Sequence, residues 1–283
     1  GNLYYIQGRS DQALASFRKA IRLKPTLSAP HVLLGVLHFK GREFEKAILH
    51  LNSAAKLGDA NPLVPLYQGY TRFALGKYED SVSFLENVIE LEPGNVDAWY
   101  HLSKAYGQLS NRNFETLQKH HANSFYTHLA RSRVFESGGN WEDARGELAK
   151  ALGHEPHRAG VKQRTEWPQR KSAGETTPPP PAADDIASTG STKYLYSPPE
   201  GSTILVAYKT ERSRVGNFES RKPDTVQNLY EQADGYQALS FLSSLWLIST
   251  EPDSYRAHQL RGQSLEAAAK LDEGLRRRSE PAP

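Results

Sequence analysis

Apolar and small residues recur along residues 1–156 with a period near 34 residues. Within each period the apolar positions follow helical spacing in two runs, which predicts two antiparallel helices per unit. The pattern therefore predicts an all-α chain built from repeated helix-turn-helix units. The recurring positions are Tyr4, Gly8, Ala13, Phe17, Ala20 and Pro25, then Gly35, His38, Ala47, Leu51 and Ala54, then Gly69, Gly76, Ser81, Leu85, Val88 and Pro93.

A small residue falls opposite a large one at the same place in successive units. Gly35 and Gly69 lie on the predicted first helices, where the absence of a side chain lets the two helices of a unit approach closely. Phe17, Leu51 and Leu85 are expected to fill the space between units.

Glycine and proline mark the expected boundaries of these helices. Gly8, Gly41 and Gly76 lie where the chain has to turn between two helices, and Pro25 and Pro93 are expected to end second helices.

The fourth unit identifies a family to which the chain is similar. Trp99, Leu102 and Tyr106 have the spacing of the W-x2-L-G-x2-Y signal, and the chain therefore resembles the tetratricopeptide repeat, in a multi-repeat array of the bacterial type. The resemblance implies an α-solenoid whose units stack into a right-handed superhelix. Gly1 falls on the family's glycine in the middle of the first helix, so the chain is expected to begin inside a truncated repeat. The fifth unit carries Gly139, Trp141, Ala144, Leu148, Ala151 and Pro156.

The chain is predicted to have three parts. Residues 1–156 form the array of about five repeats, residues 157–202 form a disordered, Pro-rich flexible linker, and residues 203–283 form a degenerate helical segment. The fourth repeat is expected to be shortened, with a second helix around Phe114 to His121. Residues 203–220 are ambiguous, and helix is favoured over strand because an isolated strand would have no partner.

The third part is predicted to be a diverged copy of residues 93–145 at an offset of 130 residues. The matching pairs run without a gap and include Pro93 with Pro223, Tyr106 with Tyr236, and Ser110 with Ser240.

Composition removes several classes of site. The 283 residues include no cysteine, which excludes disulfides, cysteine-ligated zinc, iron–sulfur clusters and a thiol nucleophile. The net charge of +3 is small for a chain that neutralises phosphates, and no apolar run is long enough to span a membrane. The compartment stays open between cytoplasm and periplasm.

Motifs that carry catalysis or hold cofactors are missing from the sequence. It has no phosphate-binding glycine loop, no dinucleotide fingerprint, no hydrolase elbow and no H-E-x-x-H. His120, His121 and His128 form the densest histidine group, but their spacing favours packing over metal binding, and His128 and its counterpart His258 are interpreted as hydrogen-bonded packing positions. We therefore expect no catalytic residue, no cofactor and no metal.

The resemblance implies a binding surface on the concave face, which the first helices line. The residues there are mainly aromatic and aliphatic, which favours an extended peptide or an amphipathic helix of a partner protein, with the lysines and the arginine preferring acidic groups. The alternative is that these residues pack against the next helix or against the chain's own linker. The positions carried over are Tyr5, Val32, Val36, Phe39, Lys40, Leu66, Tyr70, Phe73, Tyr100, Lys104, Gln108 and Arg133.

One family ligand is disfavoured. The carboxylate clamp for chaperone tails needs lysine and asparagine at set positions, and Val32, Val36, Tyr67 and His101 occupy them here.

Three functions remain in view. A non-catalytic protein-interaction scaffold is favoured, because the recognisable signal serves repeat packing. The alternatives are a targeting arm of a larger enzyme, such as a glycosyltransferase or peptidase, and contact with nucleic acid or another anionic surface through the basic residues at 158–171 and 276–278. Self-association through incomplete repeats at the ends is also expected.

Overall fold

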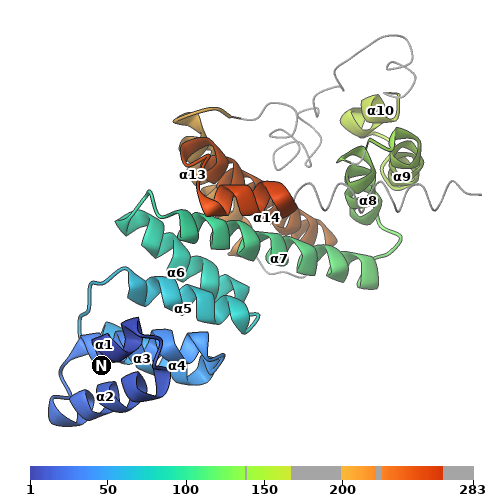
Figure 1. The fold of residues 1–283 in the computed structure, drawn as a ribbon. Helices are drawn as coiled ribbons and strands as arrows, with labels where there is room; N and C mark the ends of the chain where they lie inside the picture. Colours follow the sequence, from blue (N-terminus) through green and yellow to red (C-terminus); the bar gives the residue numbers. More distant parts are fainter. Residues whose placement is uncertain (138, 167–198, 221–224, 264–283) are drawn as a thin grey trace, which may run out of the picture. The chain divides into compact units, whose positions relative to one another are not determined.

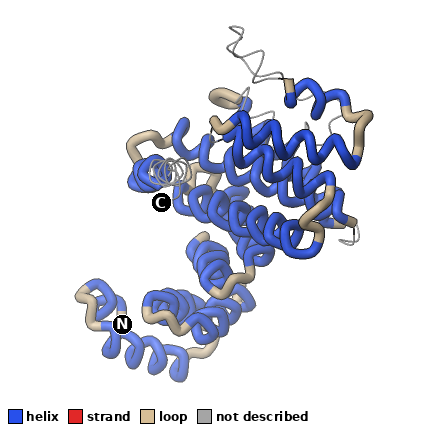
Figure 2. The backbone as a smooth tube through the Cα atoms, turned by 90° about the vertical axis from the view of Figure 1, so that its right-hand side faces the viewer, coloured by secondary structure: helices blue, strands red, loops and turns tan. Residues whose placement is uncertain are grey.

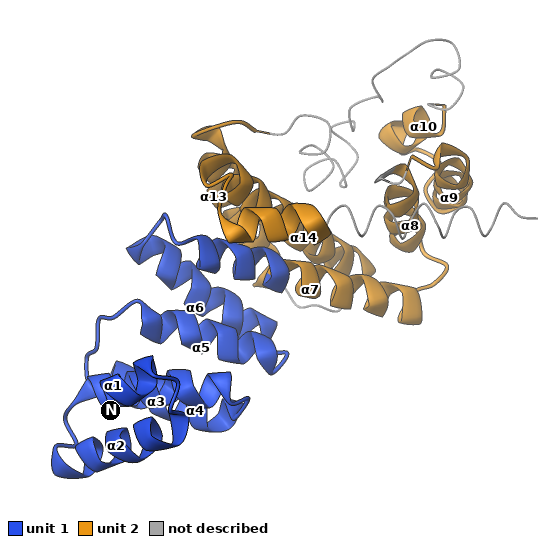
Figure 3. Ribbon diagram, viewed as in Figure 1, with its two compact units in different colours: residues 1–105 blue, residues 106–283 orange. Residues whose placement is uncertain are grey.

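The computed structural model describes residues 1–137, 139–166, 199–220 and 225–263. Throughout these ranges the regular elements are helices, joined by short turns (Figure 2). The chain divides into two compact units, residues 1–105 and residues 106–283 (Figure 3). The all-α fold expected from the 34-residue pattern is therefore confirmed.

Unit 1 consists of successive antiparallel helix pairs followed by the first part of α7 (Figure 1). Each helix of a pair packs on the other, and α4 also packs on α5, so that the pairs stack in sequence order. This is the arrangement of an α-solenoid, in which each repeat contacts its neighbours. The helices are α1 (Asn2–Ile6), α2 (Ser10–Leu23), α3 (Ser28–Lys40), α4 (Phe44–Lys56), α5 (Leu63–Ala74) and α6 (Tyr78–Leu91).

Glycine allows the close approach of the two helices within each pair. A Cβ atom added at Gly35 would lie 2.6 Å from Leu51 Cγ, and one added at Gly69 would lie 2.8 Å from Leu85 Cγ. Gly1 stands in the same relation to the ring of Phe17. These contacts confirm the pairing of small with large residues, and they recur every 34 residues because the same packing is repeated.

The turn inside the second repeat differs from the expectation. Gly8 and Gly76 take positive φ values of +72° and +73°, which suit glycine. The equivalent residue 34 positions before Gly76 is Arg42, with φ of 59°, whereas Gly41 has an ordinary φ of −78°. Gly41 thus ends α3, and the prediction that it provides the left-handed turn position is wrong.

The fourth repeat also departs from the expected helix pair. Residues Val96–His120 form one helix of 25 residues, α7, so the second helix expected around Phe114 is the end of the same helix. Ser110 occupies the register of Arg42 and Gly76, yet it remains helical and its hydroxyl donates to the Ala233 carbonyl at 2.8 Å. Without a residue that takes positive φ there, the helix continues.

Unit 2 contains the remaining described helices and the end of α7. α8 packs on α9 and α14, α10 packs on α9, and α13 packs on α14. Its core gathers Leu117, Leu129, Leu148, Val161 and Tyr230 from these helices. The helices are α8 (Phe125–Ser137), α9 (Trp141–His154), α10 (Ala159–Thr165), α13 (Thr203–Glu219) and α14 (Val226–Thr250).

Two of these helices bear on the predicted three-part division. α13 confirms the helical interpretation of residues 203–220. Residues 159–165 were assigned to the linker by composition but form α10, whose Val161 side chain is buried against the unit 2 core. Residues 167–198, which include the proline cluster, lie outside the described residues.

Helices α7 and α14 have matching bounds. Each has 25 residues, and they begin at Val96 and Val226, which are related by the predicted offset of 130. Inside unit 2, Tyr106 stacks on its counterpart Tyr236 with ring centroids 6.1 Å apart. An internal duplication would produce both relationships, and it stays a prediction.

Candidate functional site

Several residues of the expected concave surface are used in packing between repeats. The exposed fractions of Val36, Leu66, Tyr70 and Tyr100 are 3%, 7%, 9% and 5%. Val32 is equally buried and packs with alanine and valine side chains of α4 and α5. The aliphatic part of the predicted surface is therefore covered by neighbouring helices.

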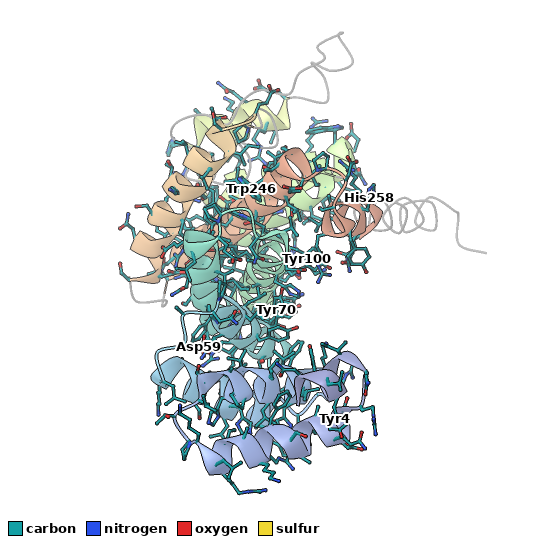
Figure 4. All side chains as sticks on the ribbon, turned by 60° about the vertical axis from the view of Figure 1, so that its left-hand side comes forward. Tyr4, Asp59, Tyr70, Tyr100, Trp246 and His258 are labelled. Atoms are coloured by element: carbon teal, nitrogen blue, oxygen red, sulfur yellow. The ribbon has the colours of Figure 1, made fainter. Side chains whose placement is uncertain are left out.

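The partly accessible side chains on the first helices of unit 1 are mostly aromatic. Phe39, Tyr67, Phe73 and His101 are half-buried, and each ring lies against another ring of the same group or against Tyr70 beneath them. We name Phe39, Tyr67, Tyr70, Phe73 and His101 the aromatic ladder. It crosses α3, α5 and α7, and Figure 4 shows Tyr70 and Tyr100 on α5 and α7.

The ladder is continuous from one repeat to the next. Ring centroids are 5.4 Å apart for Phe39 and Tyr67, and 5.5 Å apart for Tyr67 and Tyr70. The Tyr70 ring then lies 4.1 Å from His101, whose ring is 6.0 Å from Phe73. These separations are typical of interacting aromatic pairs. Tyr67, Tyr70 and Phe73 share one face of α5 because they are three residues apart.

A fixed positive charge lies at the α3 end of the ladder. The Lys40 ammonium donates to the Tyr5 hydroxyl at 3.0 Å and lies 5.0 Å from the centre of the Tyr5 ring. The hydrogen bond to Tyr5 raises the pKa of Lys40, so that its charge persists at neutral pH. Since Lys40 remains exposed, this ammonium can also meet an anionic group of a ligand.

The phenol of Tyr67 is held in its neutral form. Burial raises its pKa, and although the charge of Lys40 opposes this shift, the nearby carboxylate of Asp97 adds to it. A neutral phenol both donates and accepts hydrogen bonds. The ladder thus combines apolar ring faces with a hydroxyl that remains protonated at neutral pH.

Sequence reasoning placed some of these residues correctly on one surface and missed others. Phe39 and Phe73 were expected on the binding surface, while Tyr67 and His101 entered only as positions that lack a carboxylate clamp. The spacing of Tyr67 three residues before Tyr70 was a usable signal for a shared helix face. Lys104, expected on the same surface, is half-buried on the part of α7 that belongs to unit 1.

Arg133 and Gln108 belong to unit 2, apart from the other predicted surface residues. The guanidinium of Arg133 forms an ion pair with Asp234, and both side chains are buried. Arg133 also lines a hollow of about 340 Å³ bounded by residues of α7, α8 and α14, including Phe114 and Gln237. This hollow is a separate feature, because the aromatic ladder lies within residues 1–105.

Part of the predicted anionic-contact segment is committed to internal ion pairs. Arg158 donates to Glu155 at 2.7 Å, and Arg164, with an exposed fraction of 4%, donates to Glu136 at 2.7 Å. Arg164 therefore anchors α10 to α8. Arg170, Lys171 and residues 276–278 lie outside the described residues.

The two histidine counterparts occupy different environments. His128 is buried, with Nδ1 2.8 Å from a Glu147 carboxylate oxygen and Nε2 3.0 Å from the side-chain oxygen of Asn123. The packing role predicted for it is confirmed. His258 is exposed, so the same prediction is wrong for the second member of the pair.

A histidine cluster that the sequence did not indicate joins α3 and α4. His31 and His50 approach with their Nδ1 atoms 3.2 Å apart, and the ring of His50 stacks on His38 at 5.5 Å. Burial, followed by the charges of His31, His38 and Arg18, lowers the pKa of His50 to about 4. No group of three or more potential metal ligands with suitable geometry occurs among the described residues.

A membrane-spanning helix is likewise missing from the part of the chain that the structure describes.

Comparison with known proteins assigns the repeat. The family model described as "TPR repeat" matches residues 1–41. RNA polymerase II-associated protein 3 from Mus musculus and from Homo sapiens is 30% identical over 112 residues, which is 40% of this chain and 17% of the relative. Anaphase-promoting complex subunit 3 from Schizosaccharomyces pombe is 23% identical over 113 residues, with the same coverage. The chain thus spans less than a fifth of these relatives, and the bacterial type of array stays a prediction.

Proposed function

This chain is a tetratricopeptide repeat protein, and from that premise we propose that it is a non-catalytic scaffold that binds an extended segment of a partner protein on the aromatic ladder. The repeat family implies protein partners. The observation that carries the proposal is the row of half-buried rings that crosses three successive repeats. Contiguous apolar surface that packing leaves accessible marks an interaction site in many soluble proteins.

An extended segment suits this surface better than an amphipathic helix does. A helix docks by inserting aliphatic anchors into a wide apolar groove. The residues that would line such a groove, Val32, Val36 and Leu66, are already covered by neighbouring helices. The accessible remainder is a narrow row of rings, which can contact one edge of an extended chain.

Contact with nucleic acid receives less support. Arg158 and Arg164 are engaged with Glu155 and Glu136, and Arg164 is buried, so two of the basic side chains invoked for that role neutralise carboxylates of the chain itself. Binding through phosphates needs accessible cations in numbers, since counterion release supplies most of its affinity.

Selection from a random peptide library on the full chain tests the proposal. The recovered peptides are then measured on a Phe73→Ala variant, which trims the ladder, and on a Phe84→Ala variant, whose ring lies on α6 beneath Arg72 and outside the ladder. Peptides that lose affinity for the first variant and keep it for the second support the ladder as the binding surface. Equal binding to both variants, with helical content unchanged, contradicts it.

A further inference from the structure

We propose that the aromatic ladder selects a proline-rich segment in the polyproline II conformation that carries a carboxylate at the Lys40 end. The inference rests on the proposed function and specifies the ligand of the same surface. Its ligand is a partner-protein segment defined by three properties: pyrrolidine rings, few backbone N–H groups, and an acidic residue next to the prolines.

The shape of the ladder fits pyrrolidine rings. Neighbouring aromatic rings are tilted by 40° to 79° rather than lying in one plane, so each pair forms a shallow notch. The steps from ring to ring measure 4.1–6.0 Å. Because polyproline II rises about 3.1 Å per residue, two of its residues span about 6 Å, close to the longer of these steps. Successive notches can therefore take successive prolines on one side of the ligand helix.

The hydrogen-bonding groups at the ladder favour a ligand that mainly accepts. Lys40 donates, the neutral phenol of Tyr67 can donate, and the Tyr5 hydroxyl accepts from Lys40, so its own hydrogen is directed elsewhere. Polyproline II has unpaired carbonyl groups, and proline has no N–H. An ordinary extended peptide would bring N–H groups against apolar rings, where they lose water without a strand edge to pair with, since the described part of unit 1 is helical throughout.

The low cost of ordering also favours proline. An extended segment that docks on a narrow surface must become rigid, and this loss of entropy lowers its affinity. A proline-rich segment already populates polyproline II before it binds, which is the reason that aromatic-lined surfaces recognise such segments.

Charge sets the flanking residue. Lys40 is exposed at the α3 end of the ladder, and the Tyr5 hydroxyl fixes its position. An ammonium that is already oriented loses less entropy when it pairs with a carboxylate, although an exposed pair contributes modestly. Asp97 influences the phenol of Tyr67 farther along the surface, so an acidic residue is disfavoured there.

Fluorescence anisotropy with labelled peptides on the full chain tests the inference. The probe is an oligoproline that ends in two aspartates, and its matched control replaces the prolines by alternating glycine and serine. We expect the proline peptide to bind about tenfold more tightly than the control, and Phe73→Ala to remove that advantage. Phe84→Ala should leave both affinities unchanged.

A charge exchange tests the second element. Lys40→Glu should weaken the aspartate-ended peptide about threefold and strengthen a lysine-ended oligoproline by a similar factor, whereas Lys56→Glu, an exposed substitution on α4, should change neither. Equal affinity for the proline and glycine–serine peptides overturns the inference, as does a proline preference that survives Phe73→Ala.

The library selection separates failure of this inference from failure of the proposed function. Peptides that depend on Phe73 but show no enrichment of proline overturn the inference and leave the scaffold proposal standing. Selected peptides that all ignore the ladder overturn both.

Discussion

Arg42 takes the backbone conformation that glycine takes 34 residues later at Gly76: φ is 59° at Arg42 and +73° at Gly76. The turn between the two helices of a repeat has the same geometry in both places, although one residue carries a Cβ atom and the other does not. The left-handed region costs residues with a Cβ atom about 1–2 kcal/mol. The second repeat therefore folds with local strain that the first and third repeats avoid.

Replacing Arg42 by glycine is expected to stabilise the protein. The substitution removes the steric penalty but increases the entropy of the unfolded chain, so the net gain should be about 0.5–1 kcal/mol. Urea denaturation followed by circular dichroism measures it. Gly76→Arg is the reciprocal variant and should destabilise by a similar amount. If Arg42→Gly lowers the free energy of unfolding, the assigned conformation at this turn is wrong.

Gly69 limits how closely α5 and α6 can pack. A Cβ atom there would meet Leu85 Cγ at 2.8 Å, so Gly69→Ala should destabilise by about 1–3 kcal/mol despite the better helix propensity of alanine. The double variant Gly69→Ala, Leu85→Ala should show a favourable coupling energy, because the shortened side chain removes the clash.

Gly146 supplies the matched control for that experiment. It lies in α9 with open space around it, so Gly146→Ala should stabilise by about 0.5–1 kcal/mol through helix propensity alone. Equal and favourable effects of alanine at Gly69 and Gly146 would contradict the close packing of α5 and α6.

His50 makes unit 1 sensitive to acid. Its pKa is about 4 in the folded protein against an ordinary value near 6.5, because burial and the neighbouring charges disfavour the protonated ring. The unfolded chain therefore binds more protons than the folded chain between these two values, and stability falls as the pH is lowered from about 6.5 to about 4.

The His50→Gln variant tests this origin. It should lose less stability than the unsubstituted protein between about pH 7 and pH 5, as measured by urea denaturation at each pH. Carboxylates with lowered pKa values, such as Glu147, lose their own contribution on acidification in both proteins, so the comparison isolates the histidine. An identical pH dependence for the two proteins would rule out His50 as the titrating group.

The ion pair between Arg164 and Glu136 holds α10 on α8. Both side chains are buried, with exposed fractions of 3% and 6%. Arg164→Met leaves the Glu136 carboxylate buried without its guanidinium, and removal of one partner of a buried pair typically costs about 3–5 kcal/mol. We expect this single variant to detach α10, detectable as faster proteolysis near residues 159–165.

The double variant Arg164→Met, Glu136→Gln should recover much of that loss, because no unpaired charge stays buried. Proteolysis of the double variant that is as fast as that of the single variant would show that the pairing of charges is not what retains α10.

The regular features of this fold were predictable from the sequence. The 34-residue period, the close approaches at Gly35 and Gly69, and the helix at residues 203–220 each depend on residues near one another in the chain or on a packing arrangement that repeats. Helical spacing and glycine's lack of a side chain act locally, so the sequence carries these signals directly. The candidate binding surface was located on the first helices by the same register.

The composition of that surface required the tertiary structure. Val36 and Phe39 share a helix and a predicted role, but only Phe39 keeps an accessible ring, because burial is decided by the helix that packs alongside. Tyr67 and His101 join the ladder for the same reason, through contacts between different repeats.

The sequence by itself determined that this protein is a helical repeat array and where most of its turns lie, because period, spacing and small residues are properties of the chain. Only the tertiary structure decided that α7 continues through Ser110 and that α10 docks through Arg164. Both outcomes depend on partners distant in sequence, the Ala233 carbonyl and the Glu136 carboxylate. The free energy of such contacts is set by which groups meet after folding, and no local pattern of residues contains that information.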